Sequence, residues 1–346
     1  MPNPLLPTLI LGESLVDIVT DHHGTRHVHP GGSPANVALG LARLGHLVHF
    51  ATRVGDDDHG DLILNHLTRN GVLFTDGVVD TGPTSTATVT LDPQGRADYT
   101  FDITWDLPGA TAHQIWRRLP PYAHLHTGSI AALLAPGAAS VLDTVRAMRS
   151  SATISYDPNL RPALIGDPLD ERPNVEALVA ESDVVKVSDE DLDWLYPGVD
   201  PDKACEAWTS LGPTLVVLTR GAAGARAFWR NGTCDIAAIP VDVADTIGAG
   251  DAFMAGLIGG LLTTGLLGDP DDDLFHPSGR FELLAATSTG NLSPQITAAL
   301  LLATHAAAVT CQRPGAHAPA PDELPAYLAH LDRSLWPLPS LAYLRR

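Results

Sequence analysis

Short apolar runs alternate with amphipathic helical stretches along most of this chain, and few folds accommodate such a pattern. The apolar runs predict buried strands at 6–11, 47–54, 123–127, 153–156, 184–187 and 215–219. Stretches with helical spacing lie between several of them, at 34–44, 59–70, 136–149, 174–181 and 201–211. Short buried strands joined by helices predict an α/β fold with a doubly wound, mostly parallel sheet that is flanked by helices.

Two segments depart from this alternation and predict pairs of strands with turns, at 16–29 and 78–101. Their simplest place is a small β-sheet at one edge of the main sheet, built from about 13–30 and 78–106. Such a sheet serves either as an edge extension or as a lid over a ligand.

Three further segments complete the reading of the chain. A hairpin is expected at 228–234 with Asn231-Gly232 as its turn. The polar interval 265–294 predicts a surface loop with one short helix, and a helix is expected around 323–331. Because the chain has neither an internal repeat nor a low-complexity linker, we expect residues 1–346 to form a single domain.

Composition limits the partners and the compartment. A formal net charge of −19 argues against nucleic acid and anionic membranes, which would repel the protein. The longest apolar stretches, 252–262 and 296–309, are interrupted by glycines or polar residues and are not expected to span a bilayer. Three widely spaced cysteines and the lack of a signal peptide at the N-terminus predict a cytoplasmic protein.

The sequence offers no P-loop for binding phosphate. Lys186 and Lys203 are the two lysines, and neither follows the glycines of G-x-x-x-x-G-K. A dinucleotide dehydrogenase is also disfavoured, because no G-x-G-x-x-G follows the first strand. Backbone amides, arginines and a metal ion would therefore have to hold any phosphate.

The segment D-T-I-G-A-G-D at 245–251 leads directly into an apolar helix. Free N–H groups and the positive end of the dipole at a helix start bind a phosphate or a developing negative charge. A carboxylate there would repel phosphate, so Asp251 is placed to take a proton from the group that attacks the phosphate. We predict phosphoryl transfer to a hydroxyl, with the catalytic residues Gly248, Ala249, Gly250 and Asp251. The alternative is an acidic helix start with glycines for close packing.

A second glycine-rich segment, P-G-G-S-P-A-N at 30–36, favours a neutral, hydroxyl-rich ligand. Gly31 and Gly32 let the backbone approach a ligand, while Ser33 is expected to cap a helix that starts with proline. The amide of Asn36 in the first turn could face the same ligand. The alternative is a turn and a cap without a ligand. At the end of the first strand, Asp17 is expected either to accept hydrogen bonds from sugar hydroxyls or to be a solvent-facing turn acid.

These motifs resemble those of the ribokinase-like (PfkB) sugar kinases. The segment at 245–251 matches the family signature D-T-x-G-A-G-D, and 31–38 is similar to G-G-x-x-x-N-x-A. Between them, V-G-D-D-D-H-G at 54–60 resembles v-G-x-D-x-x-G. The resemblance extends over about residues 8–320 and implies an ATP-dependent sugar kinase with Mg²⁺, in which the small sheet is a lid.

The resemblance also implies roles for residues on the phosphate and nucleotide side. D-P-N-L-R at 157–161 resembles the family's D-x-N-x-R, which gives Arg161 a phosphate-facing role. K-V-S-D-E-D at 186–191 is similar to K-x-[NS]-x-x-E, so Lys186 and Ser188 are expected near the cofactor. Either Glu190 or Asp191 would organise Mg²⁺ through water, because the residue at 191 is Asp rather than Glu.

Two weaker matches concern adenosine and a monovalent cation. T-R-G-A-A-G at 219–224 resembles T-x-G-x-x-G, and His305 stands where the family's N-A-A-A has Asn. The residues expected near the nucleotide are Thr219, Arg220, Gly221, Gly224 and His305, the last being equally suited to a core or helix-face position. Asp245 and the loop 310–316 match a cation site of some relatives, which makes K⁺ a further expected ligand.

Several segments favour D-fructose as the substrate. G-E-S-L-V-D at 12–17 is similar to the start of fructokinases, and 101–107 and 125–129 resemble other fructokinase segments. The lid carries few cations, mainly Arg26 and Arg96, which disfavours a phosphorylated sugar. The alternatives are 2-keto-3-deoxygluconate, ribose or a nucleoside, and a sugar sensor without catalysis. Lid strands in this family often pair across a homodimer, but the residues leave the oligomeric state open.

Overall fold

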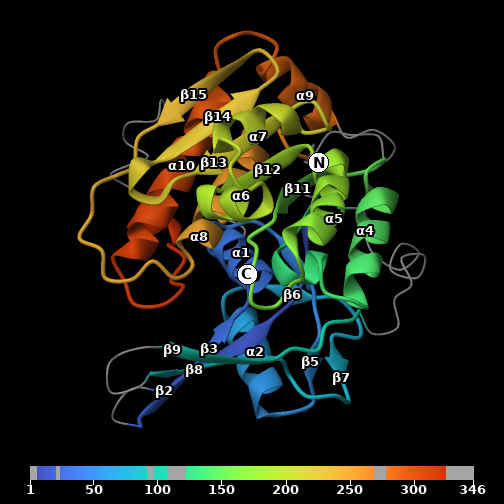
Figure 1. Ribbon diagram of the computed structural model, residues 1–346, viewed down its shortest axis with the longest axis vertical. Helices are drawn as coiled ribbons and strands as arrows, with labels where there is room; N and C mark the ends of the chain where they lie inside the picture. The colour runs from blue at the N-terminus through green and yellow to red at the C-terminus, as the bar shows by residue number, and fades with distance from the viewer. Residues whose placement is uncertain (1–5, 21–23, 92–96, 108–121, 269–277, 325–346) are drawn as a thin grey trace, which may run out of the picture.

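The computed structural model describes residues 6–20, 24–91, 97–107, 122–268 and 278–324. Its centre is a nine-stranded sheet in the order β15-β14-β13-β12-β11-β10-β1-β4-β6 (Figure 1). Neighbouring strands pair in parallel from β6 to β13, and β14 and β15 extend one edge antiparallel. The strands are β1 (Thr8–Leu11), β4 (Val48–Ala51), β6 (Leu73–Phe74), β10 (His124–Gly128), β11 (Thr153–Asp157), β12 (Val184–Ser188), β13 (Leu215–Thr219), β14 (Ala225–Trp229) and β15 (Gly232–Ile236).

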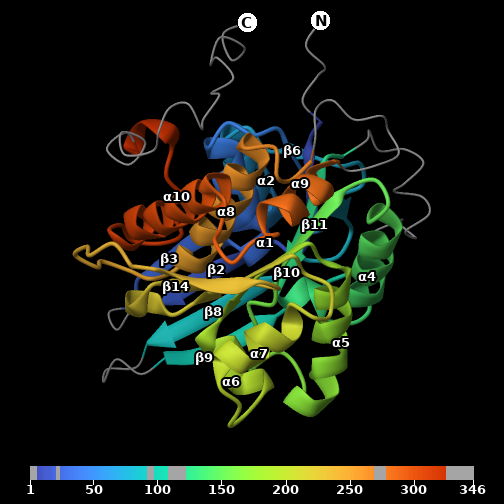
Figure 2. The same cartoon turned by 90° about the horizontal axis from the view of Figure 1, so that it is seen from above.

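Helices cover both faces of this sheet (Figure 2). One layer holds α1 (Ser33–Arg43), α2 (Asp58–Arg69), α8 (Ala249–Thr263), α9 (Ser278–Ala286) and α10 (Pro294–Cys311). The other holds α4 (Gly137–Met148), α5 (Pro168–Glu181), α6 (Asp189–Leu195) and α7 (Pro201–Trp208). Successive strand residues alternate between the two layers, since Ile10 packs in one core and Leu9 and Leu11 pack in the other. The predicted doubly wound α/β fold is therefore confirmed.

A separate four-stranded sheet projects from the body, at the bottom of Figure 1. Its order is β3-β2-β8-β9, and the strands are β2 (Leu15–Thr20), β3 (Arg26–Gly31), β8 (Thr86–Leu91) and β9 (Ala97–Asp102). The small sheet is thus present, but the strand predicted from residue 78 does not belong to it. Residues 79–80 form β7 (Val79–Asp80), which pairs with β5 (Val54–Gly55).

Other boundaries differ from the sequence-based expectations for local reasons. The run 47–54 is two strands, β4 and β5, and α5 begins at residue 168 because Asp167 caps it by accepting from the Leu169 N–H at 2.8 Å. The hairpin turn is Arg230-Asn231, one residue earlier than predicted, because Trp229 pairs with Gly232. Helix α9 confirms the short helix of 265–294. The helix expected at 323–331 lies mostly outside the described residues.

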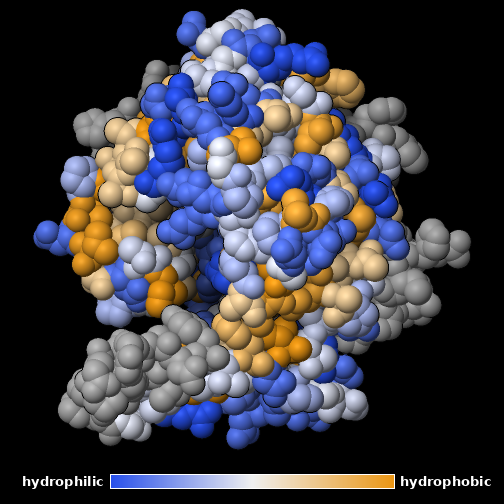
Figure 3. All heavy atoms as spheres, viewed as in Figure 1, coloured by the Kyte–Doolittle hydropathy of each residue, from blue (hydrophilic) through white to orange (hydrophobic). Residues whose placement is uncertain are grey.

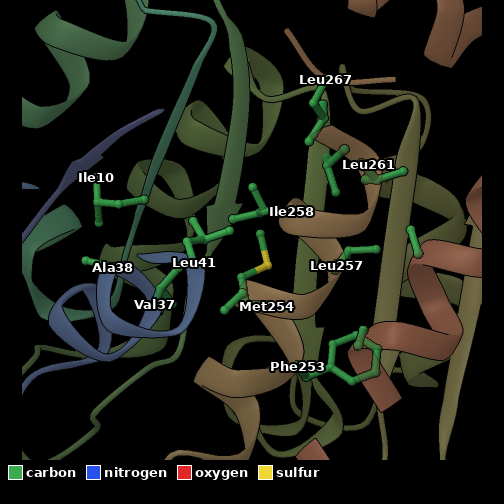
Figure 4. Packing of buried hydrophobic residues seen from close by; sticks show 14 of the residues in the cluster. Ile10, Val37, Ala38, Leu41, Phe253, Met254, Leu257, Ile258, Leu261 and Leu267 are labelled. Carbon is green, nitrogen blue, oxygen red and sulfur yellow. The ribbon is translucent and has the colours of Figure 1, made fainter. Parts of the chain in front are cut away.

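The helix that follows the acidic glycine motif lies at the centre of the molecule. Residues 251–261 of α8 are all buried. Met254 and Ile258 point toward Val37 and Leu41 of α1, as Figure 4 shows. On α8, Gly260 allows close contact with α10, since an added Cβ would lie 2.6 Å from the Ala299 Cα. Packing on two helices and the sheet therefore fixes the position of α8, and with it the position of its first turn, in the molecule.

Helix α10 is long and apolar enough to cross a membrane by composition alone, as no other helix among the described residues is. It packs along α8, however, and most of it is buried inside the protein. Its apolar character is therefore explained by its position in the core. The interruptions expected to rule out a span do not do so by composition alone, and burial accounts for the helix instead.

Candidate active site

The start of α8 offers unpaired backbone N–H groups. Gly248 precedes the helix with φ of 74°, a left-handed conformation that favours glycine. The Ala252 N–H donates to the Gly248 carbonyl at 2.8 Å. Within the described parts of the chain, the N–H groups of Gly250 and Asp251 donate to no protein acceptor. Free N–H groups of this kind are what the predicted anion-binding helix start requires, and the binding itself stays a prediction.

The carboxylate of Asp251 is buried and held by three side chains from elsewhere in the chain. Ser33 Oγ donates to Oδ1 at 2.7 Å, and Asn159 Nδ2 donates to the same oxygen at 3.3 Å. Asn36 Nδ2 donates to Oδ2 at 2.8 Å. The carboxylate is therefore oriented from both sides, and its oxygens keep further lone pairs for a ligand hydroxyl.

The prediction that Ser33 caps helix α1 is wrong. Gly32 is the N-cap residue of α1, and no side chain caps this helix. Ser33 is the first helical residue, and its hydroxyl bonds Asp251, 218 positions away in the chain. Local sequence signals could not find this contact, because the packing of α1 on α8 brings the two residues together.

The glycine pair 31–32 forms the turn from the small sheet into α1. Gly32 has φ of 102°, and an added Cβ would lie 2.8 Å from the Glu13 carbonyl oxygen. A Cβ on Gly31 would clash with the carboxylate of Asp17, which extends from β2 rather than from the end of β1. Burial raises the pKa of Asp17 to about 6; the nearby His29 and Arg161 lower it, and Asp251 raises it. Asp17 thus lies beside the glycine turn, close enough to Asp251 for the charge of Asp251 to raise its pKa.

Glu13 is a buried acid that the sequence did not single out. Its side chain is 3% exposed, and its Oε2 accepts from the Ala131 N–H at 3.1 Å. Burial raises the pKa of Glu13 to about 7, although hydrogen bonds from Ser129 and Ala131 lower it. Glu13 therefore joins the end of β1 to the turn after β10, directly behind the glycine turn.

This burial makes a prediction about stability and pH. Between about pH 4.5 and 7, Glu13 is protonated in the folded protein and ionised in the unfolded chain, so its contribution to stability is lost as pH rises. Relative to wild type, Glu13→Gln is expected to gain stability across this window, by up to about 3 kcal/mol above pH 7. Urea unfolding at pH 5 and pH 8 measures the difference. Glu206→Gln, at an exposed position of α7, is the control. A gain in unfolding free energy for Glu13→Gln that is equal at the two pH values would contradict the prediction.

Arg161 lies exposed beside the site and braces one of the donors to Asp251. Its Nη1 donates to Asn159 Oδ1 at 2.7 Å and to the Asn159 carbonyl at 3.0 Å. Asn159 has φ of 39°, an uncommon conformation for a residue other than glycine. The guanidinium is also close enough to lower the pKa values of Glu13 and Asp17. The predicted contact of Arg161 with phosphate stays a prediction.

Lys186, expected near the cofactor, is buried beneath the start of α8. Its side chain is 3% exposed, and Nζ forms an ion pair with Asp157 Oδ2 at 2.9 Å. An added Cβ on Gly250 would lie 3.1 Å from Nζ, so the ammonium group lies against the backbone of the helix start.

The structure gives Ser188 and Asp191 a bracing task. They form a capping box at the start of α6, in which Ser188 Oγ accepts from the Asp191 N–H at 3.0 Å. Asp191 Oδ2 accepts from the Ser188 N–H at 3.2 Å, and Oδ1 accepts from the Leu160 N–H at 2.7 Å. Asp191 thereby holds the Asn159 turn in place. Its contact with magnesium and the cofactor contact of Ser188 stay predictions, and Glu190 is the exposed neighbour.

The predicted nucleotide residues form a turn at the end of β13. Thr219 ends this strand, and Gly221 and Gly224 have φ of 50° and 87° around a short 3₁₀ turn. Arg220 Nη2 pairs with Asp235 at 2.9 Å, and His305 lies on α10. Their roles toward a nucleotide stay predictions.

Asp245 connects the segment before α8 to the loop after α10. Its Oδ1 accepts from the Ile247 N–H at 3.0 Å, and Oδ2 accepts from the Gly315 N–H at 2.8 Å. The N–H of Asp245 donates to the Cys311 carbonyl at 3.2 Å. The two segments predicted to hold a monovalent cation therefore do lie side by side.

On the face shown in Figure 3, a recess lined largely by hydrophilic residues opens between the body and the base of the small sheet, near the position of α8 in Figure 1. A helix start with free N–H groups and an oriented carboxylate are together suited to move a phosphoryl group onto a hydroxyl.

Comparisons with known proteins agree with this geometry. The sequence model of the pfkB family carbohydrate kinases matches residues 10–323. Over 263 residues the chain is 36% identical to the fructokinase of Klebsiella pneumoniae, covering 74% of this chain and 85% of that protein. It is 34% identical to the Escherichia coli fructokinase over 292 residues, covering 82% and 94%. A double mutant of Vibrio cholerae fructokinase, solved with fructose, ADP and potassium, matches with a TM-score of 0.75 at 26% identity, covering 96% of this chain and 100% of that one.

Proposed function

This chain belongs to the pfkB family of carbohydrate kinases, and we propose that it transfers the γ-phosphate of ATP to a primary hydroxyl of D-fructose, giving fructose 6-phosphate. The observation that carries the proposal is the buried Asp251 carboxylate beside the free N–H groups of α8. The choice of fructose is supported by two relatives named fructokinase and by the Vibrio cholerae protein that binds fructose and ADP.

In the proposed mechanism, Asp251 takes the proton of the sugar hydroxyl as the oxygen attacks the γ-phosphorus in line. The bond to the β–γ bridging oxygen breaks, and ADP leaves. The N–H groups of Gly250 and Asp251 would face the negative charge that develops on the transferred group. The Ala249 N–H, also expected there, already donates to the Thr246 carbonyl at 3.2 Å. Ser33, Asn36 and Asn159 keep the carboxylate oriented toward the sugar.

The predicted ligands follow the same arrangement. Asp17, Gly31, Gly32 and Asn36 would contact the sugar, and Arg161 would support the phosphates from the rim of the site. The turn 219–224 and His305 would accept adenosine. As a single kinase domain with a lid, the protein would close the small sheet over the sugar.

The acids of the site fit a magnesium ion that is held mainly by the nucleotide. Mg²⁺ prefers phosphate oxygens and water and needs few protein ligands. Among the described residues no group of three or more metal-ligating side chains occurs, and Asp191 is held by backbone amides. Glu190 would therefore be the acid that contacts the water around the ion. The ion would neutralise charge on the phosphates.

Potassium is the second expected ion. Its supports are the pairing of the 245 and 311–315 segments and the potassium ion in the Vibrio cholerae structure. Backbone carbonyls of these segments would be its ligands, with Asp245 holding the segments together. Dependence on ATP favours the cytoplasm as the compartment, and a homodimer remains compatible with the open edges of the small sheet.

The experiment that tests the function is ADP release with Mg·ATP and a panel of acceptors. We expect turnover with fructose, and much less with 2-keto-3-deoxygluconate, ribose, adenosine or fructose 6-phosphate. Turnover that favours another acceptor would keep the reaction and overturn the sugar. Sugar binding by calorimetry without turnover of any acceptor would instead indicate a sensor.

A further inference from the structure

We propose that Lys186 is a positioning residue for phosphoryl transfer, which acts as a fixed buried positive charge behind the helix start of α8 rather than as a contact to ATP. This inference rests on the proposed kinase reaction, and it assigns to Lys186 a task in the chemical step. The juxtaposition that carries it is the ammonium group lying between Asp157 and the Gly250 backbone.

The position of Lys186 keeps it from solvent and beside the reacting groups. Its side chain is 3% exposed, while the partner Asp157 is 1% exposed. Nζ lies 3.1 Å from the position that a Cβ on Gly250 would occupy, so glycine at 250 leaves the space that the ammonium group fills. Lys186 thus comes close to the same backbone whose N–H groups would face the transferred phosphoryl group.

The charges around Lys186 are mostly negative. The carboxylates of Asp157 on β11, Asp191 on α6 and Asp251 on α8 all interact with it, and His126 on β10 faces it as well. Burial lowers the pKa of Lys186, but the three carboxylates raise it by more, so the lysine is protonated at neutral pH. Burial and Lys186 together lower the pKa of His126 to about 3, which keeps this histidine neutral.

This arrangement creates an electrostatic problem that Lys186 reduces. Three carboxylates lie near a site that has to receive the negatively charged phosphates of ATP. Charges in a buried, water-poor region interact more strongly than in water, so one fixed cation has a large effect there. Because Lys186 is held by Asp157, its charge is in place before the transition state forms and needs no rearrangement.

Variants in which Asp157 is replaced by neutral Asn separate this role of Lys186 from simple pairing with a buried carboxylate. Lys186→Met alone would leave Asp157 buried and unpaired, which can unfold a protein. The comparison is therefore between Asp157→Asn and the double variant Lys186→Met/Asp157→Asn, which differ by the lysine charge. In Asp157→Asn, Lys186 keeps the carboxylates of Asp191 and Asp251 as compensating charges, and neither variant leaves Asp157 as an unpaired carboxylate. Lys203→Met is the matched control, because Lys203 is the other lysine of the chain and is exposed on α7.

We expect kcat of the double variant to be about 10²-fold below that of Asp157→Asn. The KM for fructose and the Kd for ADP, measured by calorimetry, should stay within about threefold, since neither ligand carries the transferred group. Thermal unfolding of both variants checks that they are folded. A kcat within about threefold of Asp157→Asn would overturn the proposal. So would a loss of kcat matched by equal losses of fructose and ADP binding, which indicates a structural role.

Failure of the proposed substrate is distinguishable from failure of this inference. Wild-type turnover of fructose tests the substrate, whereas the ratio between the two variants tests Lys186. If the wild type prefers another acceptor of the panel, the same ratio is measured with that acceptor.

Discussion

Asp251→Asn is expected to lower kcat by about 10²–10⁴-fold, the range typical for loss of a general base. The amide is nearly the same size as the carboxylate but cannot accept the proton of the sugar hydroxyl. Binding of ADP should be retained, because ADP lacks the phosphoryl group that is transferred next to Asp251. Steady-state kinetics with fructose and calorimetry with ADP measure the two quantities.

The control for this variant is Asp242→Asn, an exposed acid a few residues before the motif. It makes the same change of charge without contact to the site, and its kcat should match that of wild type. If Asp251→Asn kept more than about half of the wild-type kcat, Asp251 would not be the base.

Arg280→Met is expected to cost about 3 kcal/mol of unfolding free energy. Arg280 on α9 donates to both oxygens of Asp183, at 2.6 and 3.0 Å, and to the carbonyls of Arg149 and Ala152 at 2.9 Å each. Asp183 is only 3% exposed at its side chain, so loss of the guanidinium leaves a buried charge with much weaker pairing.

The matched control is Arg146→Met. Arg146 pairs with Glu181 at 3.3 Å but is 52% exposed, so the same substitution should cost less than about 1 kcal/mol. Urea unfolding of the two variants gives both values. Equal losses would mean that burial of Asp183 does not govern the stability of this contact.

The general architecture and the reacting group could be predicted because their signals are local. Alternating apolar runs and helical spacing led to the parallel sheet, and glycines followed by an apolar run led to the start of α8. Helix N-termini expose N–H groups in any fold, so the free N–H groups at the start of α8 could be predicted without knowledge of tertiary contacts. The resemblance to the sugar kinases added the lid and the substrate class.

Contacts between distant segments could not be predicted in the same way. Serine is common at helix caps, but the Ser33 hydroxyl instead donates to Asp251. Asp191 is an acid of the kind that can bind a metal ion, and the structure shows it holding the turn at Asn159. Arg280 falls in an interval that reads as a surface loop, but it holds α9 onto the body through Asp183. In each case one residue type suits several partners, and only packing selects among them.

The amino-acid sequence by itself therefore determined the α/β fold and the helix start at 248–251, and it singled out Asp251 as the proposed base, because backbone geometry and hydrophobic spacing act over a few residues. The tertiary structure alone decided which side chains surround Asp251 and how deeply Glu13 and Lys186 are buried. It also decided which carboxylates are already engaged by hydrogen bonds or ion pairs within the protein. Burial and hydrogen bonding between distant segments govern charge and orientation, and these exist only once the chain has packed.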